Sequence, residues 1–278
     1  MTLKVIFAGY RYRLILTLVL ILFEAGMMLL FPLFIGKAID GALKQQWIGV
    51  AYLGALGLLL LVVGMARRMF DSRFYARLYR RSGSQLMERL ARHDTSVKTA
   101  RLGMIRELIE FLENALPELI ANLLGLVGVS VILATLHFTI FYASAGLALI
   151  ILSLYWFSRN KTLRYNRQAN NELEQQVTVL SQKNDARTAV HLYRLMKWNI
   201  RLSDLEAINF SISWLFALAF LIFSIIVSVG EGPIQYGALM ALVMYVFEYI
   251  GNVINLPLYY QNWLRLKEII SRLNRAPN

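Results

Sequence analysis

Six apolar stretches, each about as long as a lipid bilayer is thick, determine what this chain can fold into. The hydrocarbon core of a bilayer accommodates about 20 apolar residues of α-helix. The chain has 278 residues, is 58% hydrophobic and has a mean hydropathy of +0.52, values that exclude an ordinary soluble protein. The sequence therefore predicts an all-α membrane protein. The six predicted spans are Leu14–Ile35, Trp47–Ala66, Pro117–Leu136, Ile140–Ser158, Asn209–Val229 and Tyr236–Leu258.

Two long polar segments, Arg67–Leu116 and Arg159–Ile208, follow the second and the fourth span, whereas the other connections are short. Apolar residues of the first segment recur at helical spacing. These residues are Phe70, Phe74, Leu78, Leu86 and Leu90 before the turn, and Ile105, Leu108, Ile109, Leu112 and Leu116 after it. We expect both segments to be antiparallel helical hairpins that continue the membrane helices beyond the lipid. The turns are expected in His93–Leu102 and Leu195–Asp204.

Positive charge is distributed unevenly between the two sides of the predicted membrane. Of the 29 Lys and Arg residues, only Lys37 and Lys44 lie on the side opposite the termini and the hairpins. The positive-inside rule then places both termini and both hairpins in the cytoplasm. The net charge of +12 is explained by this topology and by contact with anionic lipid headgroups, and we expect no nucleic-acid partner. The absence of cysteine excludes disulfides and thiolate metal sites.

Several short sequences resemble the transmembrane domain of ABC exporters, the type I exporter or type IV fold. The first is Pro-Leu-x-Ile-Gly-x-Ala-Ile-Asp at the end of the first span, within Phe31–Gly41. Arg101–Glu110 resembles the family's segment after the first intracellular turn, and Gly237–Ala241 resembles the start of its sixth helix, with Pro257 near the end of that helix. Arg265–Leu273 resembles the stretch that leads to the nucleotide-binding domain. The resemblance covers essentially the whole chain.

The resemblance implies a homodimer with exchanged helices in a bacterial inner membrane, with two cytoplasmic turns that dock a separate nucleotide-binding subunit. The candidate docking residues are Arg92, His93, Asp94, Lys98, Lys197, Trp198, Arg201 and Asp204. Solvated loops without a partner are the alternative interpretation of these turns. No G-x-x-x-x-G-K-[ST] sequence occurs before the chain stops at Asn278. We therefore expect a single six-span domain over residues 1–278 without an ATPase domain. We expect no enzymatic activity and no cofactor on this chain, with ATP entering only through a partner.

Two carboxylates lie near the middle of predicted spans, Glu24 in the first and Glu248 in the sixth. Ionisable groups at that depth normally face protein or a water-filled cavity. Tyr245, Glu248, Asn252 and Asn255 recur at steps of three and four and form one polar face of the sixth span. Glu24 and the four residues of this face are the candidate substrate or proton pathway. The resemblance implies that helices one and six line the central cavity. The alternative interpretation is a packed helix seam in which each carboxylate is protonated and silent.

Other polar residues receive structural interpretations. Glu107, Glu110 and Glu113 are expected to form ion pairs across the first hairpin with Arg73, Arg77, Arg80 and Arg81. Asn122 is interpreted as a contact between helices, and Pro117 is expected to kink the third helix. His93, His137 and His191 are too far apart in the sequence to suggest a zinc site.

The sequence as a whole predicts a transporter that moves a small molecule or peptide by alternating access. Its energy is expected to come from a separate ATPase subunit or from a proton gradient acting through the intramembrane carboxylates. These carboxylates favour cationic or amine-bearing cargo. The rival hypothesis is a membrane interaction or regulatory protein that retains the exporter scaffold and does not transport.

Overall fold

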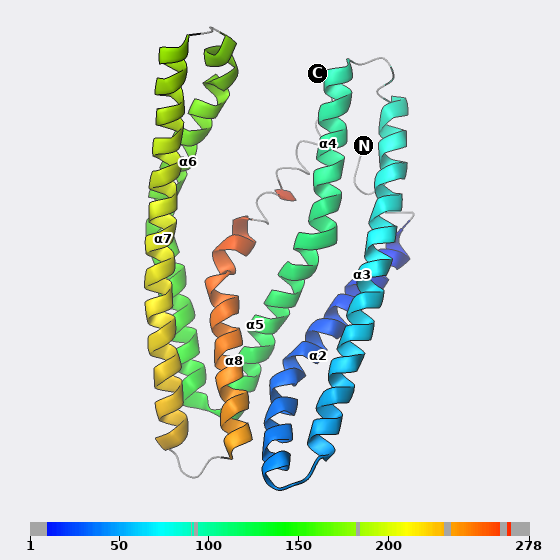
Figure 1. Cartoon of the computed structure of the whole chain (residues 1–278), viewed down its shortest axis with the longest axis vertical. Coiled ribbons are helices and arrows are strands. Elements are labelled where there is room, and N and C mark those ends of the chain that lie inside the picture. Colours follow the sequence, from blue (N-terminus) through cyan, green and yellow to red (C-terminus); the bar gives the residue numbers. More distant parts are fainter. Residues whose placement is uncertain are drawn as a thin grey trace. The chain divides into compact units, whose positions relative to one another are not determined.

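The computed structural model describes residues 10–89, 91, 94–181, 184–230, 235–261 and 266–267, and the described residues are almost entirely helical. Figure 1 shows the helices. The elements are α2 (Arg11–Leu43), α3 (Ile48–Arg89), α4 (Thr95–Glu110), η1 (Phe111–Ala115), α5 (Leu116–Leu136), α6 (Phe138–Ser181), α7 (Asp185–Gly230) and α8 (Tyr236–Ile254). No strand occurs within these ranges, which confirms the predicted all-α class.

Six helices are long and apolar enough to cross a membrane, as the sequence predicts. Three of them, α3, α6 and α7, contain 42, 44 and 46 residues. At 1.5 Å per residue they are about 63–69 Å long, roughly twice the thickness of the hydrocarbon core. The membrane helices therefore continue without a break into the polar segments, as expected for hairpins that project beyond the lipid.

The first hairpin is held together by the apolar residues that the spacing predicts. Phe74, Tyr75, Leu78 and Leu86 of α3 form one buried cluster with Ile105 and Ile109 of α4. Phe70 and Leu112 pack against the edge of this cluster. Leu90 lies outside the described residues. Burial of these side chains joins α3 to α4 beyond the predicted spans, where water would make apolar contacts favourable.

The turn of the second hairpin is not where the sequence analysis predicts it. Leu195–Asp204 lies inside α7, and the hairpin turns between Ser181 and Asp185. Asn184 is the N-cap residue of α7, and its Oδ1 accepts a hydrogen bond from the backbone N–H of Arg187 at 3.1 Å. Such an N-cap satisfies one of the free amides of the first helical turn. Since no Gly or Pro occurs between residues 185 and 208, nothing interrupts α7 over that range.

The turn of the first hairpin is also earlier than predicted. Helix α3 ends at Arg89 and α4 begins at Thr95, whereas the prediction placed the turn in His93–Leu102. Asp94 takes the extended conformation of an N-cap residue, with φ −60° and ψ 150°. The actual turn therefore overlaps only the beginning of the predicted range.

Pro117 changes the helix in a different way from the expected kink. It occupies the start of α5, directly after the π-helical turn η1. Proline has no N–H to donate to the residue four positions earlier, Glu113, so the regular hydrogen-bond ladder is interrupted there. A single π-helical turn absorbs such an interruption and rotates the side chains that follow it. The side chain of Asn114 donates to the Glu110 carbonyl at 3.2 Å and supports this turn.

The chain forms two compact units, and the first contains residues 1–138 and 225–278. In this unit α2 packs against α3, α5 and α8, and α8 also packs against α5. Helices α2 and α8 approach so closely at Gly36 and Gly237 that a Cβ on Gly36 would lie 2.5 Å from the Gly237 carbonyl oxygen. The Gly237 N–H donates to Oδ1 of Asp40 at 2.7 Å. These contacts join α2 and α8 near the ends that are remote from the hairpins.

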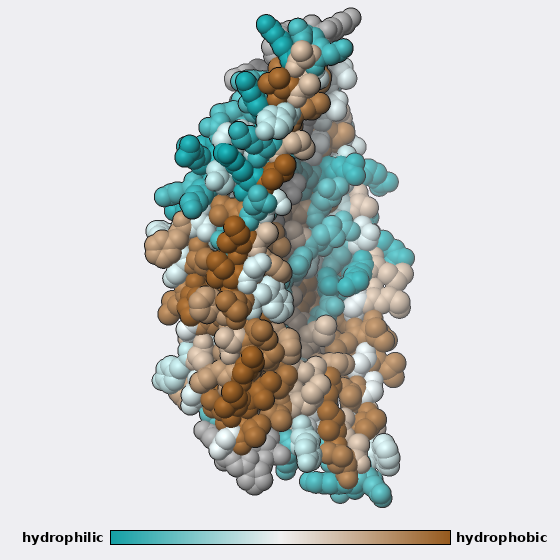
Figure 2. All heavy atoms as spheres, turned by 60° about the vertical axis from the view of Figure 1, so that its left-hand side comes forward, coloured by the Kyte–Doolittle hydropathy of each residue, from teal (hydrophilic) through white to brown (hydrophobic). Residues whose placement is uncertain are grey.

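The second unit contains residues 139–224, that is, α6 and most of α7, which run antiparallel (Figure 1). Three contacts at successive levels fix their register. The Ser158 hydroxyl donates to Asn209 Oδ1 at 2.8 Å, and the rings of Tyr165 and Trp198 lie 6.1 Å apart. Nearer the turn, Nδ1 of His191 lies 3.3 Å from Oε2 of Glu172. Figure 2 shows brown, hydrophobic side chains over the lower part of the face in view and teal, hydrophilic ones above it.

Candidate functional site

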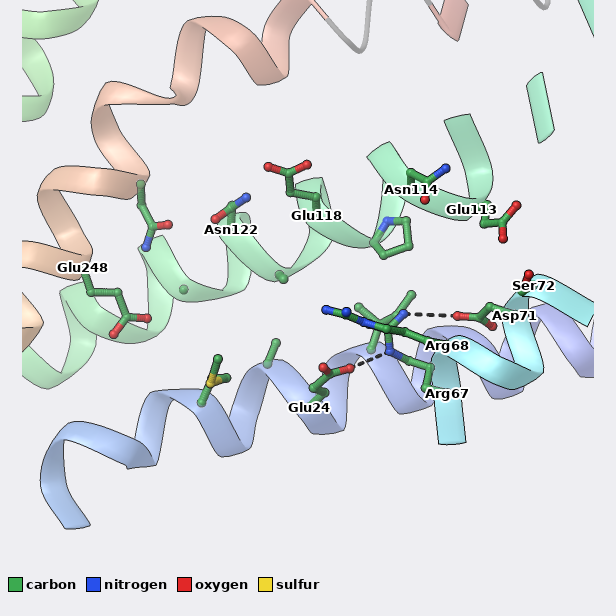
Figure 3. Close-up of a pocket in the computed structure, with 17 residues that line it drawn as sticks. Glu24, Arg67, Arg68, Asp71, Ser72, Glu113, Asn114, Glu118, Asn122 and Glu248 are labelled. Carbon is green, nitrogen blue, oxygen red and sulfur yellow. Dashed lines mark hydrogen bonds and ion pairs between the residues drawn. The ribbon is translucent and has the colours of Figure 1, made fainter. Parts of the chain in front are cut away.

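A cavity of about 750 Å³ lies within the first unit, between α2, α3, η1, α5 and α8. Figure 3 shows that charged and amide side chains from these elements surround it. On η1 and α5 its lining extends from Glu113 to Gly125, which is about 18 Å at the rise of an α-helix. The cavity thus runs from the middle of the membrane-length helices toward the first hairpin. Its lining includes five carboxylates, those of Glu24, Asp71, Glu113, Glu118 and Glu248, and the two guanidinium groups of Arg67 and Arg68.

Glu24 belongs to an ion-pair network that joins α2 to α3. Arg67 donates from Nε to Oε2 of Glu24 and from Nη1 to Oδ2 of Asp71, the second at 3.1 Å. The Thr17 hydroxyl donates to Oδ1 of Asp71 at 2.7 Å. The exposed fractions of the three charged side chains are 22% for Glu24, 12% for Arg67 and 3% for Asp71. One guanidinium is thus shared by two carboxylates, and all three side chains are mostly buried (Figure 3).

Neither sequence-based interpretation of Glu24 includes this ion pair with a residue of α3. Glu24 both contacts a neighbouring helix and lines the cavity, so the contact alone does not decide between a packed helix seam and a pathway. Arg67 and Asp71 were assigned to the cytoplasmic hairpin because the apolar span ends at Ala66. The sequence does carry one signal for the network, since Arg67 and Asp71 are four residues apart on one helix face. The pairing with Glu24 crosses 43 positions, and no local pattern predicts it.

Glu248 lies at the other side of the cavity, on α8, together with Asn252. Both side chains approach Gly125 of α5, because a Cβ on Gly125 would lie 2.9 Å from Nδ2 of Asn252 and 3.6 Å from Oε1 of Glu248. The glycine therefore lets α5 and α8 approach closely enough to bring these polar groups into the cavity wall. Within the part of the chain that the structure describes, Glu248 forms no hydrogen bond or ion pair.

Glu24 and Glu248 therefore line one cavity, as their predicted depths suggested, but only one of them is paired. Asn252 of the predicted polar face lines the same cavity. The other two residues of that face do not. The fully buried Tyr245 donates its hydroxyl to the Leu29 carbonyl at 2.6 Å and so joins α8 to α2. Asn255 is the C-cap of α8.

Several cavity residues were not predicted as site residues. Arg68, Glu113, Asn114 and Glu118 all line the cavity, as does Asn122, which the sequence analysis treated as a contact between helices. Glu113 was expected to form ion pairs across the first hairpin. Pairing across that hairpin was also expected for Glu110, which instead pairs with Arg106 of its own helix at 2.8 Å. The π-helical turn before α5 changes which side chains of this stretch face inward, and the sequence pattern does not reveal such a turn.

The predicted docking residues fall into two groups. Arg92 and His93 lie outside the described residues, while Asp94 immediately precedes α4 and Lys98 lies in its first turn. Nζ of Lys98 donates to the Ala91 carbonyl at 3.0 Å, so this residue is at the hairpin turn.

The second group, Lys197, Trp198, Arg201 and Asp204, lies well inside α7, so the prediction that it forms a turn is wrong. Trp198 packs on Tyr165, and the Arg201 guanidinium lies 5.1 Å from the centre of the Trp198 ring. Trp198 therefore packs between the two helices of the second hairpin, and Arg201 packs on Trp198.

Six membrane-length helices, an all-α architecture and hairpins that prolong the helices define an integral membrane protein with an exporter-like membrane domain. The family model of the ABC transporter transmembrane region matches residues 3–237, and the chain belongs to that family. The match extends from α2 to the first residues of α8, so Glu248 and Asn252 lie beyond it. A search among curated proteins found no match.

Proposed function

We propose that this chain is the membrane domain of a transporter that moves its cargo by alternating access through the cavity between α2, α3, α5 and α8. The observation that carries the proposal is the ionic lining of this cavity near the middle of membrane-length helices. A charged side chain at the centre of a bilayer costs about 2.5–3.5 kcal/mol on insertion scales, so chains keep such groups mainly for pathways. The family assignment supports the same function.

The contacts between α2 and α8 support alternating access. The cavity lies on the hairpin side of the helix centres, whereas Gly36, Gly237 and Asp40 bring the two helices together at the opposite ends. In our proposal this arrangement is the inward-open state, and transport requires the α2–α8 contact to open. Positive charge on the hairpin side supports a cytoplasmic location of the termini and hairpins. In our proposal the membrane is a bacterial inner membrane.

Two energy sources fit the proposal. A nucleotide-binding subunit would dock at the first hairpin turn, beside Asp94 and Lys98, and ATP would be hydrolysed on that subunit. A proton gradient would instead act on Glu248, the cavity carboxylate of α8.

We also propose that the working unit is a homodimer. Val190, Tyr193 and Ile200 on the second hairpin are 50%, 69% and 59% exposed, and apolar side chains outside the lipid are commonly covered by a partner.

Sealed vesicles that contain only the purified protein test the proposal. A proton gradient is imposed, and proton flux is followed with a dye inside the vesicles for wild type, Glu248→Gln and Glu174→Gln. Glu174 is an exposed residue of α6 and serves as the matched control. Flux that Glu248→Gln abolishes and Glu174→Gln preserves supports gradient-driven transport.

Absence of flux from the protein alone directs the test to a nucleotide-binding partner. The same vesicles are then prepared with the ATPase subunit that co-purifies with the protein, and ATP-dependent flux is measured. If neither preparation moves protons or cargo, the rival hypothesis of a non-transporting interaction or regulatory protein replaces this one.

A further inference from the structure

The groups of the cavity that remain unpaired carry both signs of charge. Arg67 is occupied by Glu24 and Asp71. Arg68, the next residue of α3, lines the same cavity, and Figure 3 shows it pointing into the space between α2 and α5. Among the described residues, neither Arg68 nor the carboxylates of Glu118 and Glu248 have an ion-pair partner. A cation alone would bind the carboxylates and leave the guanidinium of Arg68, which is exposed and has five N–H donors, without an anionic partner.

Asn252 independently indicates that a ligand with a hydrogen-bond acceptor belongs in the cavity. The residue is 7% exposed, and its Nδ2 is buried without a hydrogen-bond partner among the described residues. A buried donor without a partner costs about 1–3 kcal/mol. This donor lies in the cavity wall beside Gly125 and on the same helix face as Glu248. An acceptor on a bound molecule would satisfy it.

We propose that the cavity binds a dipolar small molecule that carries both an ammonium group and a carboxylate. The ammonium group binds Glu248, with Glu118 as the second carboxylate. The carboxylate of the ligand accepts hydrogen bonds from Arg68, and a polar atom of the ligand accepts one from Nδ2 of Asn252. This inference rests on the proposed transport function and narrows its cargo from cationic or amine-bearing molecules to amine-bearing molecules of zero net charge.

The pairing of charges also explains which carboxylates would take part. Glu24 and Asp71 already receive hydrogen bonds from Arg67, so binding a ligand would require breaking a buried ion pair. Ligand binding to Glu248 requires no such rearrangement, because Glu248 has no ion-pair partner among the described residues. Binding a dipolar ligand therefore neutralises opposite charges on both sides of the cavity without disturbing the α2–α3 network.

Linear ω-amino acids, from glycine to 6-aminohexanoate, are suitable probes because they differ in the separation of the two charges. Binding to the protein in lipid nanodiscs is measured by calorimetry. The best-binding length is then compared with its amide, which retains only the ammonium group, and with its N-acetyl form, which retains only the carboxylate. We expect at least one length to bind and either blocked form to bind about tenfold or more weakly, since each lacks one charge-assisted contact.

Two variants identify which residue recognises which end. Glu248→Gln is expected to remove the preference for the free ammonium group and to keep the preference for the free carboxylate. Arg68→Gln is expected to do the reverse. Arg106→Gln is the control, because Arg106 is exposed and paired with Glu110. If no length binds, if the amide binds as well as the free amino acid, or if Arg68→Gln retains the selectivity of wild type, the inference is overturned.

Failure of this inference is distinguishable from failure of the proposed function. Proton or cargo flux that depends on Glu248, observed together with equal binding of dipolar and blocked probes, refutes only the dipolar ligand. Absence of binding, together with absence of flux in both vesicle preparations of correctly folded protein, refutes the transporter proposal as well.

Discussion

Removal of Arg67 provides the most quantitative test of the structure, because this side chain holds two carboxylates. In the variant Arg67→Leu, Glu24 and Asp71 lose their shared partner, and the Asp71 side chain is only 3% exposed. Removing one partner of a buried ion pair costs about 3–5 kcal/mol, mainly because the remaining charge stays buried. Glu24→Gln should cost less, about 1–2 kcal/mol, since Arg67 keeps Asp71 and Glu24 is partly exposed.

The assay is reversible unfolding in mixed micelles with increasing SDS, followed by the fluorescence of the five tryptophans. Arg68→Leu is the control because it removes the same charge from the adjacent position without breaking an ion pair of the described structure, and it should change the free energy of unfolding by about 0.5 kcal/mol or less. The triple variant Arg67→Leu, Glu24→Gln, Asp71→Asn should recover much of the loss, since no buried charge remains. Equal destabilisation by Arg67→Leu and Arg68→Leu would refute the buried network.

Three further predictions follow from contacts of α8 and from the topology. In the same unfolding assay, Gly237→Ala should destabilise the protein, because the new Cβ would collide with the Gly36 carbonyl and the Asp40 carboxylate. Gly251→Ala, which has open space around the new Cβ, should stabilise the protein by up to about 1 kcal/mol. Tyr245→Phe should cost about 1 kcal/mol through the lost hydrogen bond to the Leu29 carbonyl, whereas Tyr236→Phe should be neutral because Tyr236 is 74% exposed. Equal effects of the two substitutions would contradict the α2–α8 contact. Because the chain has no cysteine, a single introduced cysteine reports topology without background labelling. A membrane-impermeant maleimide should label Gln46→Cys in intact cells and Asn184→Cys only after permeabilisation. The reverse pattern would contradict the proposed orientation.

Sequence periodicity predicts those parts of the fold that local hydropathy controls. The six spans and the apolar core of the first hairpin, such as Phe74 and Leu78 against Ile105, follow directly from apolar residues at helical spacing. The second turn was mislocated because a polar amphipathic helix and an exposed loop have similar composition. Only the capping residue Asn184 distinguishes them, and its signal is one residue long.

The candidate site is less predictable than the fold because it depends on contacts between distant segments. Glu24 and Glu248 were identified from their cost in a membrane, and they do line one cavity. Arg67 lies just past the end of an apolar span, so local hydropathy assigns it to the cytoplasm, although a long side chain can reach back to Glu24. The π-helical turn η1 adds a rotation that brings Glu113 and Asn114 to the cavity, and it has no clear sequence signature.

Water access to the cavity distinguishes a transport pathway from a packed helix seam, because the pathway must be hydrated and the seam is dry. Asn122 lines the cavity, whereas its neighbour Leu123 on α5 is 44% exposed and is not part of the lining. The two positions differ in depth by about 1.5 Å. The measurement is the rate at which a small, charged thiol reagent modifies Asn122→Cys and Leu123→Cys in membranes open to the cytoplasmic side. We expect rapid modification of Asn122→Cys and very slow modification of Leu123→Cys, because in our proposal the exposed side chain at position 123 faces lipid. Equally slow modification of both cysteines would contradict a hydrated pathway.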